Sequence, residues 1–361
     1  MIVISNLVLL PTQFPKVNLD NLWSNFRINS QPRRPTKILQ SHLFIHLLVM
    51  SILERLTFSG PSFNPTTDIP NLSEKVILVT GGNNGIGLET IVQLAKHSPE
   101  KLYMGARSEQ KAEAAIAQVK KLVPGAAISF LKVDVSSFAS VKAAAEHFLS
   151  EEHRLDILVN NAGIMGVEPG LSTDGYEIHF ATNHLGPALL TKLLFPALTK
   201  SSLPRVVNVA SVLYDRAPSS GIAFDKLKTD CAGLGTLPIY GMTKLANIYH
   251  AQELARRFPN ITAVSLHPGL VRTDIFGSHA RKESPLLVWL AAVPGRIISV
   301  DVAVGALNQL WASTCTSEQV QNGAFYMPYG KLITGPALIE DKTAAKELWE
   351  WTENEFRKHG F

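Results

Sequence analysis

From Lys75 onward, short apolar runs alternate with longer amphipathic stretches, and this alternation constrains the fold more than any other feature. The apolar runs are Val76–Val79, Leu102–Gly105, Ile128–Val133, Ile157–Val159, Val206–Val209 and Ala263–Leu266. Continuous apolar runs of this length are typical of parallel strands that are buried on both faces. The stretches between them favour helices at Leu88–Lys96, Gln110–Leu122, Val141–Leu149, Gly186–Leu198 and Thr243–Arg257. We therefore predict an α/β fold in a single domain: a doubly wound parallel sheet with helices on both faces, with Phe325–Met327 as an edge strand.

The distribution of charge bears on nucleic-acid binding, and the two cysteines bear on metal sites, disulfides and compartment. Residues 1–49 hold five bases and one acid, so the formal charge of +4 is located there and the remaining chain carries 29 bases and 29 acids. A neutral body has no electrostatic footprint for nucleic acid, and we predict no such partner. Cys231 and Cys315 lack the spacing of a metal site or a disulfide framework. We expect no metal and a reducing, cytoplasmic compartment.

The first part of the chain, residues 1–70, is predicted to be an extension that precedes the domain at 71–361. It lacks the basic start of a secretory signal, and the apolar stretch Ile38–Leu53 is interrupted and shorter than a membrane span. Its scarcity of acids fits a mitochondrial leader, although the amphipathic pattern is poor. Alternatively, Met50 is the true start. Membrane-associated or mitochondrial locations apply only if residues 1–49 belong to the mature protein.

A glycine-rich turn follows the first predicted strand and opens the first predicted helix. Its glycines allow a tight turn and a close approach of the backbone to a pyrophosphate, whose charge would lie at the helix N-terminus. The spacing differs from GxGxxG, and a plain strand–helix connection is the alternative. We predict a dinucleotide site that includes Thr80, Gly81, Asn83, Gly85, Ile86 and Gly87.

The end of the second strand indicates which dinucleotide is bound. An NAD-dependent enzyme usually places an acid there, whereas this chain has Arg107. A guanidinium suits a ribose 2′-phosphate, which favours NADP. Glu109 nearby keeps NAD as the less favoured alternative, and a solvated surface arginine is the other interpretation of Arg107.

Tyr240 and Lys244 place a phenol and an ammonium on one face of a predicted helix. A phenol is a poor base at neutral pH, but an adjacent cation favours the phenolate. The pair would therefore exchange a proton with a substrate oxygen.

Taken in order, Thr80–Gly87, Asn160–Gly163, Ser211 and the Tyr240/Lys244 pair resemble the short-chain dehydrogenase/reductase family. The resemblance extends from about Asn71 to the C-terminus. The sequence around Val207–Ser211 and Tyr240–Arg257 is similar to the branch of retinol dehydrogenases and WW-domain oxidoreductases, which includes many fungal members. The fold that this implies is the Rossmann fold.

The resemblance also implies roles for single residues. Tyr240 would be the acid in carbonyl reduction and the base in alcohol oxidation. Lys244 would lower the pKa of Tyr240 and hold the nicotinamide ribose. Ser211 would bind the reacting oxygen, and Asn183 would position a proton relay through Lys244. The remaining cofactor contacts would be Asp134 at the adenine, Asn161, Ala162 and Gly163 beside the adenosine, and Pro268, Gly269, Val271 and Thr273 near the carboxamide. From the residues alone, Asn183 also fits a buried polar group, Asp134 a turn former and His267 a satisfied structural histidine.

The substrate is predicted from two variable segments. Asp215–Ile239 resembles an insertion that covers the substrate mouth, and Asp274–Val300 is where the family forms its lid. The apolar core of the lid, Pro285–Pro294, suits a lipophilic or aromatic substrate, a helix at a membrane surface or simple packing on the domain. We expect an NADP(H)-dependent oxidoreductase of ketones, aldehydes and alcohols, in a setting such as secondary metabolism. A cofactor-binding regulatory protein is the alternative.

Association with a second copy of the chain is also expected, because family members often pair through helices into homo-oligomers. The Trp-rich segment Leu348–Trp351 is interpreted as an exposed tail that serves an interface or caps the sheet. A membrane surface is a conceivable partner that the sequence does not specifically indicate.

Overall fold

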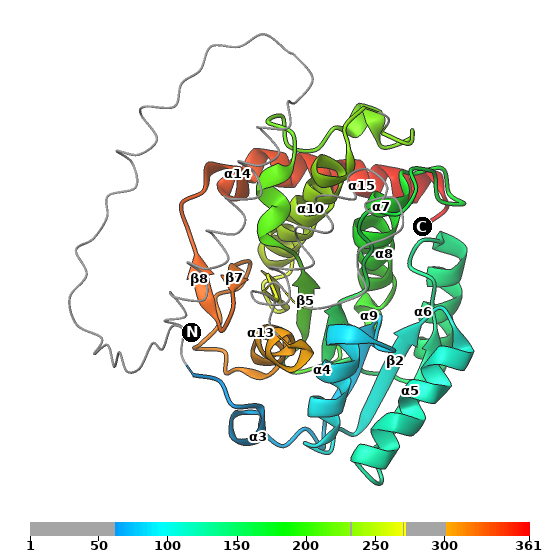
Figure 1. The fold of residues 1–361 in the computed structure, drawn as a ribbon, viewed down its shortest axis with the longest axis vertical. Coiled ribbons are helices and arrows are strands. Elements are labelled where there is room, and N and C mark those ends of the chain that lie inside the picture. The colour runs from blue at the N-terminus through cyan, green and yellow to red at the C-terminus, as the bar shows by residue number, and fades with distance from the viewer. Residues whose placement is uncertain (1–61, 232, 270, 272–300) are drawn as a thin grey trace, which may run out of the picture. The chain divides into compact units, whose positions relative to one another are not determined.

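The computed structural model describes residues 62–231, 233–269, 271 and 301–361, and the predicted sheet lies within them (Figure 1). Eight strands follow the order β3-β2-β1-β4-β5-β6-β7-β8. Their bounds are β1 Val76–Thr80, β2 Lys101–Ala106, β3 Ile128–Lys132, β4 Ile157–Asn160, β5 Arg205–Val209, β6 Thr262–Leu266, β7 Phe325–Met327 and β8 Lys331–Ile333. All neighbouring pairs from β3 to β7 are parallel. The chain adds β2 and β3 on one side of β1 and then adds β4 to β7 on the other side, so the order of strand addition reverses between β1 and β4. The predicted doubly wound fold is confirmed.

Helices connect the strands on both faces. Their bounds are α3 Pro65–Asp68, α4 Gly85–Ala95, α5 Glu109–Leu122, α6 Phe138–Glu151, α7 Ile178–Phe180, the π-helix η1 Ala181–Leu185, α8 Gly186–Leu193, α9 Phe195–Leu198, the 3-10 helices η2 Val212–Arg216 and η3 Phe224–Lys226, α10 Thr236–Arg257, α13 Val302–Thr314, α14 Ala337–Glu340 and α15 Lys342–Lys358. The single helix predicted at Gly186–Leu198 is wrong, because α8 ends before Leu194 and Pro196 lies in the first turn of α9. Proline is tolerated in a first turn and lacks the N–H that a continuing helix needs.

Two hydrophobic cores explain why the strands read as continuous apolar runs. Along β1, Val76 and Leu78 belong to the core beneath α6, α8, α10 and α15. Ile77 and Val79 belong to the core beneath α4, α5 and α13. Each side chain of β1, β4 and β5 is buried whichever way it points, so these strands show no alternation of buried and exposed positions.

The far end of the sheet differs from the prediction. Phe325–Met327 is a strand, parallel to β6, but it is not the edge because β8 pairs with it in the antiparallel direction. Gly330 forms the connecting turn with φ +69°, and a Cβ there would lie 2.5 Å from the indole of Trp311. A glycine is therefore required for the hairpin to close over α13.

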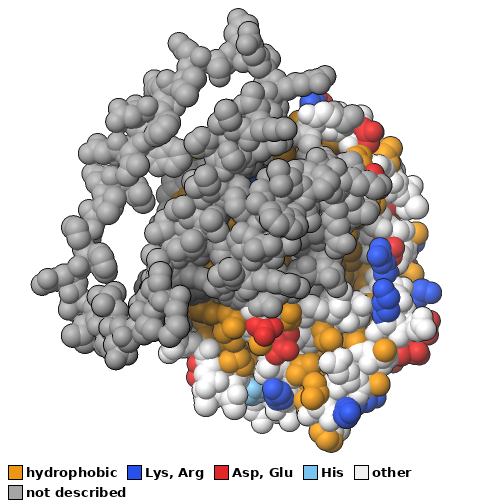
Figure 2. Space-filling view, viewed as in Figure 1, with side chains coloured by type: hydrophobic (Ala, Val, Ile, Leu, Met, Phe, Trp, Pro, Cys, Tyr) orange, Lys and Arg blue, Asp and Glu red, His pale blue; other side chains and the backbone are white. Residues whose placement is uncertain are grey.

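The C-terminal helix α15 packs along α10, over the helix layer rather than the sheet (Figure 1). Leu348 in the Trp-rich segment is 1% exposed. The interpretation of this segment as an exposed tail or a cap on the sheet is therefore wrong. Across the described ranges, no helix has the length and apolar character that a membrane crossing requires. Figure 2 shows basic and acidic side chains interspersed over the described part of one face.

Candidate active site

The predicted site residues gather at the carboxyl ends of the parallel strands. The glycine turn follows β1, Arg107 follows β2, Asp134 follows β3, Asn161 follows β4 and Ser211 follows β5. These ends meet along one edge of the sheet, where open α/β folds bind their ligands. Thr273 and the predicted lid Asp274–Val300 lie outside the described residues.

The glycine turn is tightly packed against the end of β4. Gly81 has φ +66°, and a Cβ on Gly87 would lie 2.4 Å from the Gly81 carbonyl oxygen, so both positions need glycine. Asn161 Nδ2 donates to the Thr80 carbonyl at 2.8 Å, and the Asn161 amide donates to Thr80 Oγ1 at 3.1 Å. Asn84, the N-cap of α4, makes no side-chain capping bond within the described part of the chain. The first-turn amides of α4 are thus open to an anion such as a pyrophosphate.

Ser211 and Tyr240 meet beneath the end of β5. Ser211 is extended, at φ −163°, and its Oγ accepts from the Leu213 amide at 3.2 Å as η2 begins. The Ser211 hydroxyl also forms a hydrogen bond with the Tyr240 phenol, and Tyr240 is 5% exposed. Burial raises the pKa of Tyr240 and outweighs the lowering effect of Ser211. The expected shift toward phenolate is therefore not found, and the phenol is protonated at neutral pH.

Lys244 lies one helical turn beyond Tyr240, with its ammonium 5.4 Å from the phenol ring centre. Its Nζ donates to the Val209 carbonyl at 2.9 Å, which fixes the side chain against β5. Burial lowers the pKa of Lys244 to about 8. The group thus carries its charge at neutral pH and loses it in mildly alkaline solution.

Asn183 lies in η1, a π-helical turn of the kind that often occurs at functional sites. Its Oδ1 accepts from the Ile164 amide at 2.7 Å, and its Nδ2 donates to the Ile164 carbonyl and to Thr243 Oγ1. A Cβ on Gly163 would lie 3.2 Å from Asn183 Oδ1 and 3.6 Å from Lys244 Nζ. The absence of a side chain at Gly163 keeps this space beside the ammonium open. Sequence reasoning missed Thr243 and the Val209 carbonyl because neither carries a motif signal.

Two predicted adenosine contacts have different surroundings. Arg107 is exposed, and no hydrogen bond or ion pair joins it to another described residue, so its guanidinium is available to a ligand. Asp134 Oδ1 accepts from the amide and the hydroxyl of Ser136, at 3.0 and 2.6 Å. Asp134 therefore forms a turn, as its alternative interpretation predicted, and the adenine role stays a prediction.

The segment after β6 contains Pro268, Gly269 and Val271. Val271 packs on α13, where a Cβ on Gly305 would lie 2.4 Å from its side chain. His267 is 2% exposed, and within the described ranges neither ring nitrogen has a hydrogen-bond partner. The prediction of a satisfied histidine is thus wrong. Burial, reinforced by Lys244, lowers the pKa of His267 to about 3, so the ring is neutral.

Comparisons with known proteins identify the family of this chain. Residues 75–224 match the family model for short chain dehydrogenase. A short-chain dehydrogenase/reductase from Armillaria gallica is 38% identical over 294 residues, which cover 79% of this chain and 91% of the relative. Mouse retinol dehydrogenase 12 is 36% identical over 242 residues, which cover 64% of this chain and 75% of the relative.

A solved structure supports the fold at lower identity. The crystal structure of an uncharacterized protein from Mycobacterium Paratuberculosis superposes with a TM-score of 0.64 at 26% identity. The match covers 83% of this chain and 98% of that chain.

Proposed function

Because the chain belongs to the short-chain dehydrogenase/reductase family, we propose that it is an NADP(H)-dependent enzyme that interconverts a lipophilic ketone or aldehyde with the matching alcohol. The family membership makes it an oxidoreductase with an NAD(P)-binding Rossmann fold. The observation that carries the finer proposal is the buried phenol of Tyr240, hydrogen-bonded to Ser211 and followed one turn later by the buried Lys244.

Proton transfer is assigned to Tyr240. In carbonyl reduction the oxygen gains negative charge as hydride reaches the carbon, and a positioned acid lowers that barrier. Burial keeps the Tyr240 phenol protonated, so it is suited to donate. Ser211 would hold the same oxygen through a hydrogen bond. The nicotinamide, when bound, supplies the hydride.

The cofactor would be held by groups that the fold leaves open. The glycine turn and the uncapped start of α4 suit the pyrophosphate. Lys244, whose ammonium borders the open space at Gly163, suits the nicotinamide ribose. Arg107, exposed and unpaired among the described residues, suits a 2′-phosphate and supports NADP over NAD.

A lipophilic substrate is supported by two observations. The segment Pro285–Pro294 is apolar in sequence, and binding pockets are mostly apolar with few polar groups. The name of the mouse relative, retinol dehydrogenase 12, denotes activity on a lipophilic alcohol.

The test uses the full chain. We expect NADPH to bind more tightly than NADH in a fluorescence titration, and a panel of lipophilic ketones, aldehydes and quinones to oxidise the bound cofactor, followed by absorbance. Binding without turnover on any member would favour the alternative of a cofactor-binding regulatory protein. Failure to bind either cofactor would refute the proposal.

Cofactor choice is tested at Arg107. Replacing it by Glu removes the partner of the 2′-phosphate, and charge-assisted hydrogen bonds contribute about 1.5–3 kcal/mol. We expect Arg107→Glu to weaken NADPH binding by about 10–100-fold and NADH binding far less. Glu109→Gln, two positions away and also exposed, is the matched control. Equal losses for the two cofactors would remove Arg107 from the cofactor site.

A further inference from the structure

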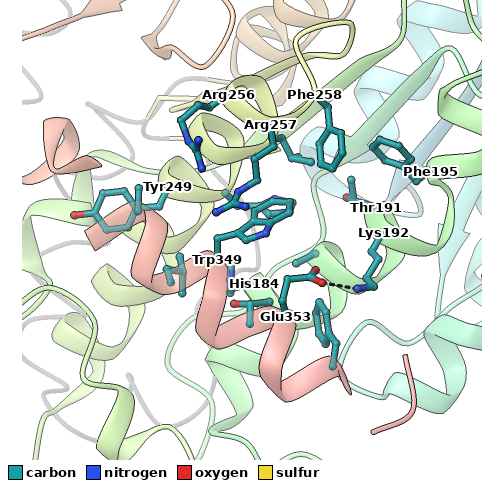
Figure 3. A pocket seen from close by; sticks show the side chains of 17 residues that line it. His184, Thr191, Lys192, Phe195, Tyr249, Arg256, Arg257, Phe258, Trp349 and Glu353 are labelled. Atoms are coloured by element: carbon teal, nitrogen blue, oxygen red, sulfur yellow. Dashed lines mark hydrogen bonds and ion pairs between the residues drawn. The ribbon is translucent and has the colours of Figure 1, made fainter. Parts of the chain in front are cut away.

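A groove of about 790 Å³ lies between α8, α10 and α15, in the volume range of small-molecule sites. Ser211, Tyr240 and Lys244 do not line it, so it is separate from the catalytic group. Figure 3 shows Trp349 and Glu353 of α15 near Arg257 at the end of α10, Phe258 directly after it and Lys192 of α8. Helices that are distant in sequence therefore form its walls.

The walls are lined with aromatic rings. The ring centres of Phe195 and Phe258 are 4.4 Å apart with the rings tilted by 59°, and Trp349 stacks on His250 with ring centres 5.8 Å apart at 15°. The guanidinium of Arg257 lies 5.0 Å from the Trp349 ring. Such walls suit a planar apolar ring.

The charges around the groove are positive in balance. Arg256 and Arg257 both bond to the single carboxylate of Glu253, each at 2.7 Å. Glu253 itself does not line the groove, whereas both arginines do. Lys192 pairs with Glu353 at 2.6 Å, and Glu350 near Arg256 pairs with Lys346 at 3.6 Å. One of the two arginines therefore lacks a carboxylate of its own, and this net positive charge favours the binding of an anion.

One buried hydroxyl in the lining has no partner. The Thr352 hydroxyl makes no hydrogen bond within the described residues, at 5% exposure. His184 is 1% exposed and has the Asn247 side chain as a hydrogen-bond partner. Burial, reinforced by His250, lowers the pKa of His184 to about 3, so its ring is neutral and adds no charge to the groove. An unsatisfied buried hydroxyl is costly, and a ligand oxygen would accept its hydrogen bond.

We propose that this groove is a second ligand site, for a small aromatic carboxylate. The ring packs against the aromatic side chains that line the groove. The carboxylate faces Arg257 and accepts a hydrogen bond from Thr352. The site is independent of the oxidoreductase reaction and of its cofactor.

The test is calorimetric titration of the full chain with 1-naphthoate, with the neutral 1-naphthamide as ligand control. We expect naphthoate to bind at least about tenfold more tightly than naphthamide, because the charge is recognised. Thr352→Val keeps the shape and removes only the unpartnered hydroxyl, and Arg257→Gln removes the charge. Each is expected to weaken naphthoate binding about tenfold. Lys342→Gln, exposed on the same helix outside the groove, should bind as the wild type does.

Three results would overturn the proposal. The first is naphthoate binding no more tightly than naphthamide. The second is wild-type affinity in the Thr352→Val and Arg257→Gln variants, checked for unchanged thermal melting. The third result is a dimer in sedimentation velocity that dissociates on Arg257→Gln, which would make the groove an interface between copies of the chain.

Discussion

Replacing Tyr240 by Phe removes the hydroxyl beside Ser211 and leaves the buried ring in place. Positioned acid–base groups contribute about 10²–10⁴-fold to a rate. We expect Tyr240→Phe to bind NADPH as the wild type does and to lose turnover by a factor in that range. Cofactor titration and steady-state rates on a substrate from the carbonyl panel measure the two properties.

The control for this variant is Tyr249→Phe on the same helix. Tyr249 donates to the Leu338 carbonyl at 2.6 Å, so its hydroxyl holds the C-terminal segment. Tyr249→Phe should lower thermal stability and spare turnover. If Tyr240→Phe turned over at the wild-type rate, the phenol would have no part in proton transfer.

We expect the buried charge of Lys244 to lower the free energy of unfolding, although turnover requires this residue. Burial lowers its pKa from 10.5 to about 8, so below pH 8 the folded chain holds a charge that burial disfavours. Lys244→Met should raise the free energy of unfolding at pH 7 by about 1–3 kcal/mol and abolish turnover. The Val209 carbonyl keeps Asn247 as a donor at 3.2 Å in this variant.

The sign of this effect makes it testable by pH. Between pH 8 and 10.5 the unfolded wild type binds a proton that the folded state lacks, so wild-type stability rises with pH relative to the variant. The advantage of Lys244→Met should therefore shrink between pH 8 and pH 10.5 in urea denaturation. An advantage that stayed constant with pH would exclude the buried charge as its cause.

Single residues were predictable where their signal is local. The glycine turn and the Tyr240/Lys244 spacing were found from neighbours in the chain. The pKa of Tyr240 was not, because burial by distant segments outweighs nearby groups. The bond from Asn183 to Thr243 joins residues 60 positions apart, and nothing in their local sequence indicates it.

At the scale of elements, the start of α8 depends on Gly186. A Cβ there would lie 1.8 Å from the Val135 carbonyl oxygen, so α8 would have to move and take η1 and Asn183 with it. Overpacking of this kind costs about 1–3 kcal/mol. We expect Gly186→Ala to lower the free energy of unfolding by that amount and to reduce turnover. Urea denaturation and steady-state rates measure both.

Gly170→Ala provides the comparison for Gly186→Ala. A Cβ on Gly170 would meet no atom within 4 Å, and its φ is not in the left-handed region. Stability and turnover should be close to those of the wild type. Equal effects of the two substitutions would show that glycine flexibility, rather than the approach of α8 to Val135, is responsible.

The spacing of apolar residues locates the elements but not all of their ends. The strands were located from apolar runs, but η1 and the interruption between α8 and α9 follow from backbone packing and from Pro196. β8 is three residues long and mostly exposed, so it has no apolar run that would reveal it. α15 was noticed only as a Trp-rich segment, although Asp341 caps its N-terminus and its buried positions share one helical face; its packing partner α10 is what the sequence does not indicate.

Over the whole molecule, the predicted architecture follows from local alternation, whereas the attachment of the C-terminal helix depends on distant partners. Glu355 of α15 bonds Tyr176, 179 positions away, at 2.7 Å. Lys228, from the segment between Ser211 and Tyr240, pairs with the same carboxylate at 2.7 Å. Glu355 therefore links three parts of the chain that the sequence alone does not bring together.

Removing the charge of Glu355 is expected to destabilise this connection. Burial alone would raise its pKa, but hydrogen bonds from Lys228, Lys358 and Tyr176 outweigh it and lower the pKa to about 2, against an ordinary value of 4.5. We expect Glu355→Gln to lower the free energy of unfolding at pH 7 by about 1–3 kcal/mol, since both lysines are more than half exposed and partly screened.

The same shift predicts how this loss depends on pH. A carboxylate whose folded pKa is depressed stabilises the fold above pH 4.5 and ceases to do so as pH falls toward 2. The difference between the wild type and Glu355→Gln should therefore diminish from pH 5 to pH 2 in urea denaturation. Glu350→Gln, at an exposed pair with Lys346, should change little at any pH. A Glu355→Gln deficit that persisted unchanged at low pH would mean that packing of α15, rather than the ionised carboxylate, holds the three segments together.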